Sequence, residues 1–414
     1  MKIAIVGTGI SGLVVAYLLS PKYDITVFEA NDYIGGHTHT IEVEQQGTTY
    51  AVDTGFIVFN DWTYPNFVRL LARLGVASQP STMSFSVKCE KTGLEYNGTS
   101  LNTLFAQRRN LLRPAFYRMV RDILRFNSAA PALLQNDALD LTLSHYLEAH
   151  RYSHEFVEHY LLPMGAAIWS ANPQQMRRFP ARYFVQFFHN HGMLNLNNRP
   201  QWRVIMGGSA RYVEALTRPY RERIRLRCPI QSITRYPSHV EVQPRHGEKE
   251  RFDQVVIATH SDQALALLTD PTEAEGEVLN AFPYQENEAI LHTDSTLLPR
   301  RRLAWASWNY HILREGHDRV AITYHMNSLQ NLRAPQPFCV TLNHSDAIDP
   351  ATVIRRITYH HPVYTPRAVA AQKRHHSLNG VNRTSFCGAY WGYGFHEDGV
   401  NSALTVCQAF GKSL

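Results

Sequence analysis

Cysteine is scarce in this chain, and its few copies are not arranged for a structural role. The 414 residues include 5 cysteines, an odd number, and no two of them have the C-x-x-C spacing. Disulfide frameworks use paired cysteines, and zinc sites usually use closely spaced ones. The sequence therefore argues against a disulfide framework and against a cysteine-based zinc site. The 21 histidines contain no H-E-x-x-H motif either, and we expect no metal.

Long apolar runs and lysine are also scarce. No run approaches the roughly 18 apolar residues that a membrane-spanning helix needs. The net charge of +6 rests mainly on arginine, because the lysines are only Lys2, Lys22, Lys88, Lys91, Lys249, Lys373 and Lys412. Arginine holds phosphate in a forked geometry, which suits a dinucleotide, a phospholipid head group or nucleic acid. Dispersed surface charge is the simpler explanation, and we expect no nucleic-acid partner.

The first thirty residues contain a glycine-rich turn between two expected strands. Residues 2–6 are a short apolar run typical of a buried parallel strand, and residues 24–28 form a second one. Between them, Gly7, Gly9 and Gly12 form a G-x-G-x-x-G turn that opens a helix. Gly7 permits the tight turn, Gly9 lets a pyrophosphate approach the backbone, and Gly12 lets the helix and the strand pack closely.

The second expected strand ends at Glu29, where a carboxylate can accept both hydroxyl groups of an adenosine ribose. A G-x-G-x-x-G turn alone is weak evidence. Here it follows a strand, opens a helix and is followed by its acidic partner, so the segment predicts a dinucleotide site. The residues expected at this site are Gly7, Gly9, Ile10, Ser11, Gly12, Glu29 and Ala30.

The N-terminus also has some features of a secretory signal, since Lys2 is followed by apolar residues. However, three glycines interrupt the apolar stretch, and no small-residue cleavage site follows. Cleavage would also remove the strand on which the expected fold depends. We therefore expect a cytoplasmic protein whose folded part begins at residue 2.

A second glycine pair, Gly35 and Gly36, follows Glu29 and precedes His37. The pair lets the chain pass beside the same pyrophosphate, and His37 can donate to a phosphate oxygen. This extension resembles the flavoprotein superfamily of amine oxidases, phytoene desaturases and UDP-galactopyranose mutase. The resemblance implies FAD as the cofactor in place of NAD. No cysteine lies in a recognisable covalent-flavin context, so we expect the FAD to be noncovalent.

The same resemblance implies further cofactor-binding segments along the chain. The segment with Thr54, Gly55 and Phe56 would pass beside the isoalloxazine ring, and the backbone of Ile230 would hold the adenine. The segment with Ala258 and Thr259 would return the chain to the nucleotide sheet. A final strand ending at Gly388 would meet the pyrophosphate, and a helix near Gly399 and Val400 would face the N1/O2 edge of the flavin.

These nucleotide-binding segments alternate with longer insertions. We therefore expect an α/β fold in which a Rossmann-type FAD-binding domain of the p-cresol/amine-oxidase type is interleaved with a mixed α+β substrate domain. The expected FAD-binding domain comprises residues 1–62, 203–265 and 381–414. The expected substrate domain comprises residues 63–202 and 266–380.

Several secondary-structure elements can be placed from periodicity and turn residues. Residues 40–59 read as two strands joined by a Gln-Gly turn, and residues 64–183 have a helical pattern. Helices are expected at 66–74, 113–130 and 143–162, with an interruption at 163–165, and a terminal helix is expected to open at Gly399.

The expected helix near residue 120 carries Arg118, Arg121 and Arg125 on one face. The simplest interpretation is a solvated helix face. The alternative is a basic amphipathic helix that rests on anionic lipid, which would place the protein peripherally at the inner face of the membrane.

Other stretches carry a closer resemblance, among them residues 167–170, 199–202 and 304–309. They resemble the N-terminal flavin domain of plant cyclopropane-fatty-acid synthases and its free-standing bacterial relatives, over nearly the whole chain. The resemblance implies a flavin oxidase or desaturase that acts on fatty-acyl lipid. The methyltransferase half of those plant enzymes is missing here, so a methyltransferase partner would be a separate chain.

The expected reaction is oxidation of an unsaturated or methyl-branched acyl chain by hydride transfer from an activated C–H to flavin N5. A base would remove the second proton. The candidates are His191, Tyr310 and Tyr324, with core packing as good an explanation for each. An apolar tunnel or simple core packing would equally explain Trp169, Trp202, Trp305 and Trp308.

Two other functions stay open. One is flavin-dependent isomerisation of an acyl double bond, because the G-G-x motif also serves isomerases. The other is a non-catalytic flavin protein that presents lipid to a methyltransferase. Amine oxidation is disfavoured, because amine oxidases of the superfamily commonly place a lysine beside flavin N5. In the second insertion the only lysine is Lys373, within a polar run typical of a surface.

Overall fold

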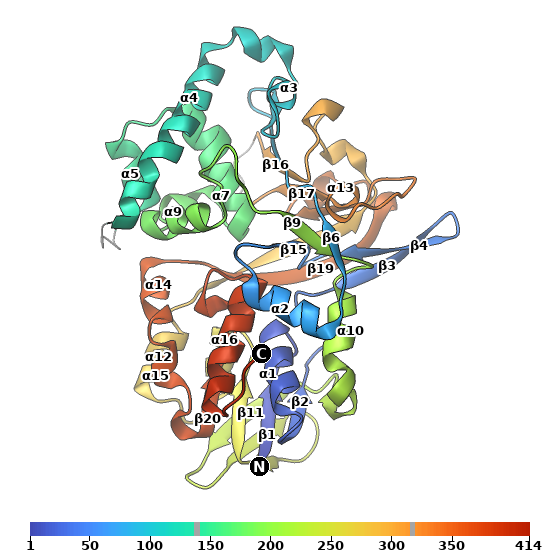
Figure 1. The fold of residues 1–414 in the computed structure, drawn as a ribbon, viewed down its shortest axis with the longest axis vertical. Helices are drawn as coiled ribbons and strands as arrows, with labels where there is room; N and C mark the ends of the chain where they lie inside the picture. Colours follow the sequence, from blue (N-terminus) through green and yellow to red (C-terminus); the bar gives the residue numbers. More distant parts are fainter. Residues whose placement is uncertain (136–140, 315–318) are drawn as a thin grey trace.

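The computed structural model describes residues 1–135, 141–314 and 319–414. Its lower half in Figure 1 holds a parallel sheet with helices beside it, and its upper half holds a second sheet next to a layer of helices. The N-terminus lies at the lower end of this view. Within the described ranges, no helix is both long and apolar enough to cross a membrane.

A five-stranded sheet forms the lower half, and every neighbouring pair in it is parallel. Its strand order is β10-β2-β1-β14-β20, so strands from the start, middle and end of the chain lie side by side. The strands are β1 (Lys2–Val6), β2 (Asp24–Phe28), β10 (Ile224–Arg225), β14 (Gln254–Ile257) and β20 (Thr384–Phe386). This arrangement confirms the expected α/β fold and both strands predicted near the N-terminus.

Other elements bury both faces of this parallel sheet, which explains its continuous apolar runs. Ile3 and Ile5 pack toward one face, and Ala4 and Val6 pack toward the other. The first face is covered by α1 (Ile10–Leu19), α2 (Pro65–Leu74), α10 (Ala210–Thr217) and α16 (His396–Ala409). The second is covered by β11 (Ile230–Arg235), β12 (Val240–Pro244), β13 (Glu250–Phe252), α11 (Ser261–Leu267), α12 (Glu273–Leu279), α14 (Pro366–Gln372) and α15 (His375–Leu378).

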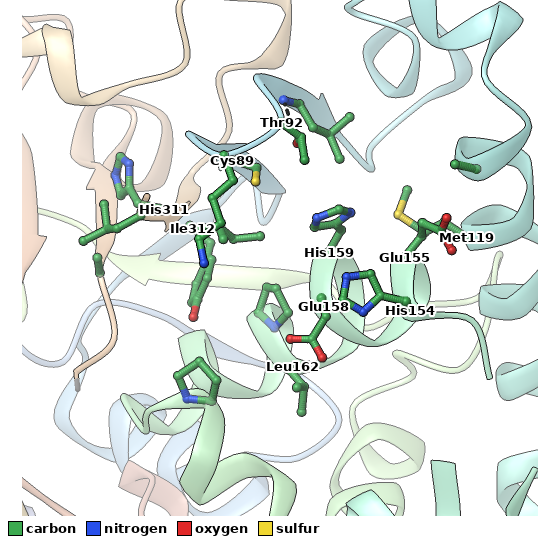
Figure 2. Close-up of a pocket in the computed structure, with 18 of the residues that line it drawn as sticks. Cys89, Thr92, Met119, His154, Glu155, Glu158, His159, Leu162, His311 and Ile312 are labelled. Carbon is green, nitrogen blue, oxygen red and sulfur yellow. Dashed lines mark hydrogen bonds between the residues drawn. The ribbon is translucent and has the colours of Figure 1, made fainter. Parts of the chain in front are cut away.

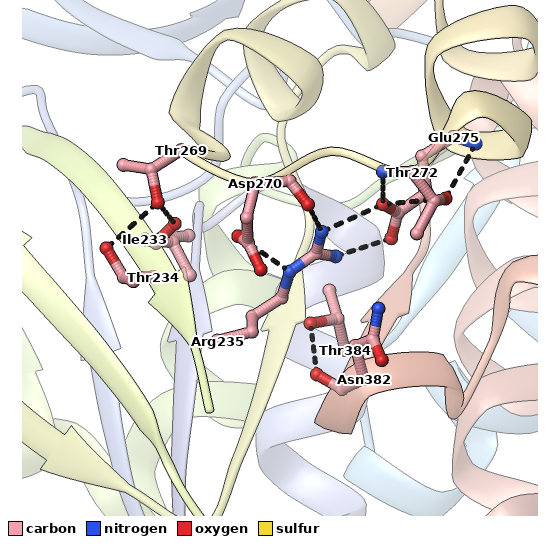
Figure 3. A network of polar contacts seen from close by, with 9 residues as sticks. All are labelled: Ile233, Thr234, Arg235, Thr269, Asp270, Thr272, Glu275, Asn382 and Thr384. Carbon is pink, nitrogen blue, oxygen red and sulfur yellow. Dashed lines mark hydrogen bonds and ion pairs between the residues drawn. The ribbon is translucent and has the colours of Figure 1, made fainter. Parts of the chain in front are cut away.

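A buried ion pair joins β11 to α12 (Figure 3). The two Nη atoms of Arg235 donate to the Glu275 carboxylate at 2.5 and 2.9 Å, and Nε donates to Asp270 at 3.1 Å. The Arg235 and Glu275 side chains are each 1% exposed. Burial raises the pKa of Glu275, but hydrogen bonds from Arg235 and Thr272 outweigh it and hold that pKa below its usual value. The pair therefore stays charged and fixes the small sheet against the helix.

The sheet of the upper half has seven strands in the order β19-β15-β18-β17-β16-β7-β8. All neighbouring pairs are antiparallel except β16 and β7, which are parallel. The strands are β7 (Phe85–Cys89), β8 (Leu94–Asn97), β15 (Tyr284–His292), β16 (Trp308–Ile312), β17 (Ile322–His325), β18 (Cys339–Leu342) and β19 (Val353–Pro362).

The two faces of the seven-stranded sheet differ in polarity, because successive residues of a strand point to opposite sides. On one face, directly paired residues form an apolar row that crosses every strand: Ile357, Ala289, Leu342, Ile322, Tyr310, Val87 and Tyr96. On the other face, buried polar side chains bond each other, as in the 2.9 Å contact of His311 with Thr323 and the 2.8 Å contact of Thr323 with Thr341.

A layer of helices covers the apolar face. It consists of α4 (Pro114–Ala129), α5 (Leu143–Ala149), α6 (His154–Phe156), α7 (Leu162–Trp169), α8 (Pro173–Arg177) and α9 (Ala181–Asn190). The helices predicted at 66–74 and 113–130 are confirmed as α2 and α4. The single helix predicted at 143–162 is wrong, because α5 and α6 are separate and a π-helical turn follows at Val157–Leu161.

Two predicted helix boundaries are also wrong. No interruption occurs at 163–165, since α7 runs through these residues; the preceding π-helical turn accommodates Pro163, which has no N–H to donate. The terminal helix begins at His396 and not at Gly399. Its start is capped by Asp398, which accepts the backbone N–H of Phe395 at 2.9 Å.

A hairpin and a small three-stranded sheet lie near β15 and β19 in Figure 1, with the hairpin projecting to the right of this view. The hairpin β3 (Thr40–Gln45) and β4 (Thr48–Asp53) turns at Gln46 and Gly47, whose φ angles are 49° and 74°. Positive φ at both central residues is typical of tight hairpins, and the predicted Gln-Gly turn is confirmed. The remaining elements are β5 (Phe59–Asn60), β6 (Ser78–Pro80), β9 (Trp202–Ile205), α3 (Leu101–Leu104) and α13 (Met326–Gln330).

Candidate active site

The glycine-rich turn lies at the carboxyl end of β1, between β1 and α1. The N–H of Gly7 donates to the carbonyl of Phe28 at 2.8 Å. A Cβ on Gly12 would lie 2.1 Å from the Gly7 carbonyl oxygen, whereas a Cβ on Gly9 would meet nothing within 4 Å. Packing therefore requires glycine at position 12, while Gly9 borders open space in which a pyrophosphate can approach the backbone.

Glu29 is held firmly at the end of β2. Its side chain is buried and accepts the N–H groups of Thr8 at 3.0 Å and Asn31 at 2.9 Å. Its carbonyl accepts the N–H of Cys228 at 2.8 Å, which brings the segment leading to Ile230 beside it. The structure thus places the residues expected at the ribose and at the adenine next to each other.

Two further turns approach the first one. Gly36 has a φ of +60°, and a Cβ there would lie 3.2 Å from the Cα of Gly9. A Cβ on Gly55 would lie 2.2 Å from the carbonyl oxygen of His37, which also accepts the N–H of Phe56 at 2.8 Å. Segments 7–12, 35–37 and 54–56 therefore converge at one place.

The later cofactor segments also reach this turn. A Cβ on Gly7 would lie 2.8 Å from the carbonyl oxygen of Ala258, the residue before Thr259. Gly388 lies two residues after the end of β20, and its N–H donates to the Ser402 hydroxyl at 2.9 Å. Gly399 and Val400 pack as core on the helix side of the turn; the Gly399 carbonyl accepts the Ser11 hydroxyl at 2.9 Å.

Several buried polar atoms in this region have no hydrogen-bond partner. In the described part of the chain they include Nε2 of His37 and the hydroxyl of Tyr364. Buried polar atoms are nearly always bonded, so these atoms require a polar neighbour. Together with the open space beside Gly9, they fit a phosphate-bearing dinucleotide.

His37 lies in a cluster of aromatic and imidazole rings. Its ring centroid is 4.9 Å from that of Tyr359 and 5.3 Å from that of His361. Burial lowers the pKa of His37 to about 3, and neighbouring His260 adds to the shift; burial likewise lowers the pKa of His361 to about 3. These imidazoles are therefore neutral near pH 7. Among the described residues, no group of three or more histidine, cysteine or acidic side chains is arranged to hold a metal.

Sequence reasoning missed an aromatic cluster that faces the last cofactor segment. Tyr183 lies 5.5 Å from Tyr364 and 4.4 Å from Tyr393, measured between ring centroids. The hydroxyl of Tyr364 would lie 2.7 Å from a Cβ on Gly394. Downstream, the ring of His396 stacks at 3.4 Å on Phe56. The glycine- and aromatic-rich stretch at residues 388–395 was the available signal for these contacts.

The three proposed catalytic side chains lie in different surroundings. His191 ends α9, stacks at 3.8 Å on Phe187 and bonds the Phe187 carbonyl at 2.9 Å. Burial lowers its pKa to about 4. Tyr324 packs edge-on against Trp308, with centroids 5.1 Å apart. Of the three, only Tyr310 lines the cavity described next, and burial raises the pKa of both tyrosines.

A cavity of about 750 Å³ lies between the helices and the part of the seven-stranded sheet that contains β16 and β7 (Figure 2). Its apolar lining includes Phe116 and Met119 of α4, Leu162 of α7, and Tyr310 and Ile312 of β16. This volume falls within the roughly 300–1,000 Å³ typical of small-molecule sites. No sequence pattern indicated it, because its walls come from four separate parts of the chain.

One polar group in the cavity has an unusual acidity. Burial of the Cys89 thiol raises its pKa, but hydrogen bonds to His159 and Thr92 outweigh burial and lower that pKa to about 7. Figure 2 shows Cys89, Thr92 and His159 on the same side of the cavity. The carboxylates of Glu155 and Glu158 are paired with arginines, Arg118 and Arg177 respectively, which neutralises the acidic side of the cavity.

Two features of the lower half define a dinucleotide-binding domain: the glycine turn at the carboxyl edge of the parallel sheet and the acidic residue that ends the neighbouring strand. The upper half, with its cavity, forms a second domain. The family can be stated more closely. The family model for flavin containing amine oxidoreductase matches residues 10–301. The chain belongs to this family and is an FAD-dependent oxidoreductase, which confirms the predicted superfamily and cofactor.

Solved structures share the whole fold at low sequence identity. Cyclohexylamine oxidase from Brevibacterium oxydans IH-35A is 16% identical with a TM-score of 0.69, and each chain is 99% covered. A putrescine oxidase variant is 14% identical with a TM-score of 0.70, covering 99% of this chain and 98% of the other. A CLA-producing fatty acid isomerase from P. acnes is 15% identical with a TM-score of 0.68 and the same coverage. No curated protein matches the chain.

Proposed function

We propose that this FAD-dependent oxidoreductase acts on the acyl chain of a lipid and oxidises or desaturates it next to a double bond or a methyl branch. The observation that carries the proposal is the apolar cavity beside β16 and β7 of the seven-stranded sheet. The same sheet contacts the cofactor segments through β19 at its opposite edge.

The contact at the cofactor end is made by Tyr359. It lies two residues from Ile357 on the same face of β19, and its hydroxyl is 2.9 Å from the hydroxyl of Thr54. Its ring stacks on His37. At the other end, Tyr310 belongs both to the row and to the cavity wall. The row between these two ends is buried beneath the helix layer. The open apolar wall is that of the cavity, which suits a hydrocarbon better than a small polar substrate.

The polar groups of the cavity argue against an amine. An alkylammonium ion buried in an apolar cavity needs a carboxylate as partner, but Glu155 and Glu158 already pair with arginines. The lysines are also placed elsewhere. Lys373 is exposed after α14, as the sequence predicted, and Lys88 donates to the Thr296 carbonyl at 3.2 Å on the polar face of the sheet. These placements support a neutral or anionic acyl substrate.

The chain's own residues would orient the substrate, exclude water and handle one proton. Bound FAD supplies the acceptor for the hydride released from the activated C–H. Phe116 and the other apolar walls of the cavity would hold the acyl chain. Tyr310 keeps its proton near pH 7, because burial raises its pKa, so it can donate a hydrogen bond but is a poor base. His361, which lies beside His37, is neutral near pH 7 and can accept a hydrogen bond, but the burial that lowers its pKa to about 3 also makes it a weak base.

Double-bond isomerisation is the second candidate, and the shared fold with a fatty acid isomerase supports it. A third possibility is a flavin-containing partner of a separate lipid methyltransferase. Product analysis distinguishes the three. The holoprotein would be incubated with an unsaturated fatty acid in detergent and with oxygen as electron acceptor, and the lipid analysed by mass spectrometry.

Oxidation predicts a product lighter by two hydrogens, in an amount equal to the oxygen reduced. Isomerisation predicts unchanged mass with a displaced double bond and no oxygen consumption. Recovery of the unaltered lipid with each tested chain would contradict both enzymatic proposals and leave the partner role. A boiled sample and free FAD serve as controls, because neither contains the folded cavity.

A further inference from the structure

The segment from α3 to α4 exposes large apolar side chains at the upper end of the molecule in Figure 1. Leu101 is 77% exposed and Leu112 is 87% exposed. The other exposed apolar residues of this segment are Leu111, Tyr117 and Leu124. We call these five residues the α4 surface. Single exposed leucines are ordinary, but five large exposed apolar side chains within one short segment indicate a surface that binds another molecule.

The outer face of α4 and the turn before it form this surface. Leu111, Leu112, Tyr117 and Leu124 line one groove, together with Arg118 and Arg121. The opposite side of the same helix is buried, with Phe116 and Met119 in the cavity wall. Helix α4 therefore separates the cavity from the exposed apolar surface.

The charges around the α4 surface are almost all positive. Residues 101–125 contain Arg108, Arg109, Arg113, Arg118, Arg121 and Arg125. The only acidic residue in that range is Asp122, whose side chain is 1% exposed and accepts the N–H of Ser153 at 2.8 Å. Glu155 pairs with Arg118 at 2.5 Å, and Asp122 lies 3.7 Å from Arg121 and 3.5 Å from Arg125, but the Arg121 side chain stays 71% exposed. Apolar side chains interleaved with outward arginines match the interface of an anionic bilayer.

We propose that the α4 surface docks on an anionic lipid bilayer, with Leu111 and Leu112 inserted among the acyl chains and the arginines at the phosphate level. This inference rests on the proposed acyl-lipid function. Arg113, at the start of α4, lines the cavity, and Pro114 next to it lines the groove. A chain lifted from the bilayer would therefore pass the start of α4 to reach the cavity.

The charge pattern also selects the bilayer over a second copy of the chain. In a two-fold symmetric contact, the same patch faces itself. Such a contact would set the exposed Arg121 against its own copy, while the nearby acidic side chains, Asp122 and Glu155, are only 1% and 21% exposed. An anionic bilayer neutralises the arginine and covers the leucines in one step.

The experiment is co-sedimentation of the full-length FAD-loaded protein with phosphatidylcholine vesicles, with and without phosphatidylglycerol, at low and high salt. The wild type should pellet with phosphatidylglycerol vesicles at low salt and less at 1 M salt, where the Debye length falls to about 3 Å. Leu112→Asp should bind about tenfold or more weakly, because burial of a leucine is lost and a charge is added. Arg121→Gln should bind about fivefold more weakly.

Matched controls are Leu196→Asp, at another leucine exposed outside the α4 surface, and Arg367→Gln, on α14 in the lower half of the molecule. Both should bind like the wild type. Equal flavin content in all five proteins shows that they are folded. The inference is overturned if the wild type stays in the supernatant, if phosphatidylcholine binds it equally, or if Leu112→Asp binds no worse than Leu196→Asp.

Failure of docking and failure of the proposed function give different results. The wild type would also be mixed with a detergent-dispersed fatty acid, for which no bilayer is needed. Conversion of that lipid without vesicle binding would overturn the docking inference alone. Vesicle binding that requires the α4 surface, without conversion of any acyl lipid, would support docking and contradict the proposed substrate.

Discussion

Gly9 and Gly12 belong to the same turn, but glycine is needed at each for a different reason. At Gly12, a side chain would collide with the protein's own backbone, because its Cβ would lie 2.1 Å from the Gly7 carbonyl oxygen. At Gly9, the protein leaves room for a side chain, and its backbone has φ −64° and ψ 171°, which any residue can adopt. Gly12 is therefore constrained by folding, whereas Gly9 is constrained by the cofactor.

This difference predicts that Gly9→Val folds but does not retain FAD, because the added side chain occupies the place of the pyrophosphate. Purified Gly9→Val should be colourless, with the same thermal midpoint as the flavin-free wild type. The matched control is Gly276→Val in α12, where a Cβ also meets nothing within 4 Å. That variant should stay yellow, and acid should release its flavin. A full flavin content in Gly9→Val would refute the placement of the dinucleotide.

At the scale of elements, the sequence predicted those strands and turns whose formation depends on neighbouring residues alone. The strand before Gly7 and the hairpin turn at Gln46 and Gly47 follow from apolar runs and turn residues, and both are present. The start of α16 was misplaced because its N-cap is Phe395, a residue that rarely caps helices, and the carboxylate of Asp398 does the capping instead.

The seven-stranded sheet could not be predicted in the same way. Its parallel pair joins Val87 to Tyr310, residues far apart in the chain, and no local signal specifies such a partner. The cavity depends on this strand pairing and on the position of α4, so it could not be predicted from the sequence either. Of the proposed catalytic residues, Tyr310 was a candidate with core packing as an equal explanation, and nothing in the sequence placed it beside a cavity.

Element packing gives a second prediction, at the ion pair between β11 and α12. Replacing Glu275 with alanine would leave Arg235 charged, buried and without its main partner, which should lower the free energy of unfolding by about 3–5 kcal/mol. Urea unfolding followed by circular dichroism measures this loss. The control Glu214→Ala breaks a surface pair with Arg211, whose two side chains are 62% and 63% exposed, and should cost no more than about 1 kcal/mol. Equal losses in the two variants would contradict the structural role of the buried pair.

At the scale of the whole molecule, many histidines are buried and uncharged. Burial is the main cause that lowers the pKa of each, to about 3 or 4, in His37, His191, His260, His292, His361 and His375. Burial acts oppositely on carboxyl groups, raising the pKa of Asp53 to about 6 and that of Asp398 to about 7. The histidines outnumber these two acids, so they dominate the pH dependence.

Stability should therefore decrease as the pH falls below about 6.5, the ordinary pKa of histidine. Between pH 6.5 and 4, histidines of the unfolded chain bind protons, whereas the buried histidines of the folded protein stay unprotonated. Acid therefore favours the unfolded state. The two raised carboxyl groups have the opposite sign, since they stabilise the fold at low pH and lose that effect as pH rises. The free energy of unfolding should be at least about 2 kcal/mol lower at pH 5 than at pH 7. Urea titrations with excess FAD test this, and equal or greater stability at pH 5 would show that the histidines are not buried as described.

The α4 surface and the cavity lie on opposite sides of α4, and the sheet that lines the cavity contacts the cofactor segments through Tyr359. The family establishes the flavin. The acyl chain is the proposed substrate, so the reaction between the two is the decisive property.

The most direct measurement is the absorbance spectrum of the bound flavin under anaerobic conditions. The yellow holoprotein would be titrated with a detergent-dispersed unsaturated fatty acid and, separately, with cyclohexylamine and putrescine. The account predicts that the fatty acid bleaches the flavin band, that oxygen restores it, and that neither amine changes it. Bleaching by an amine, with no response to any acyl lipid, would contradict the central claim.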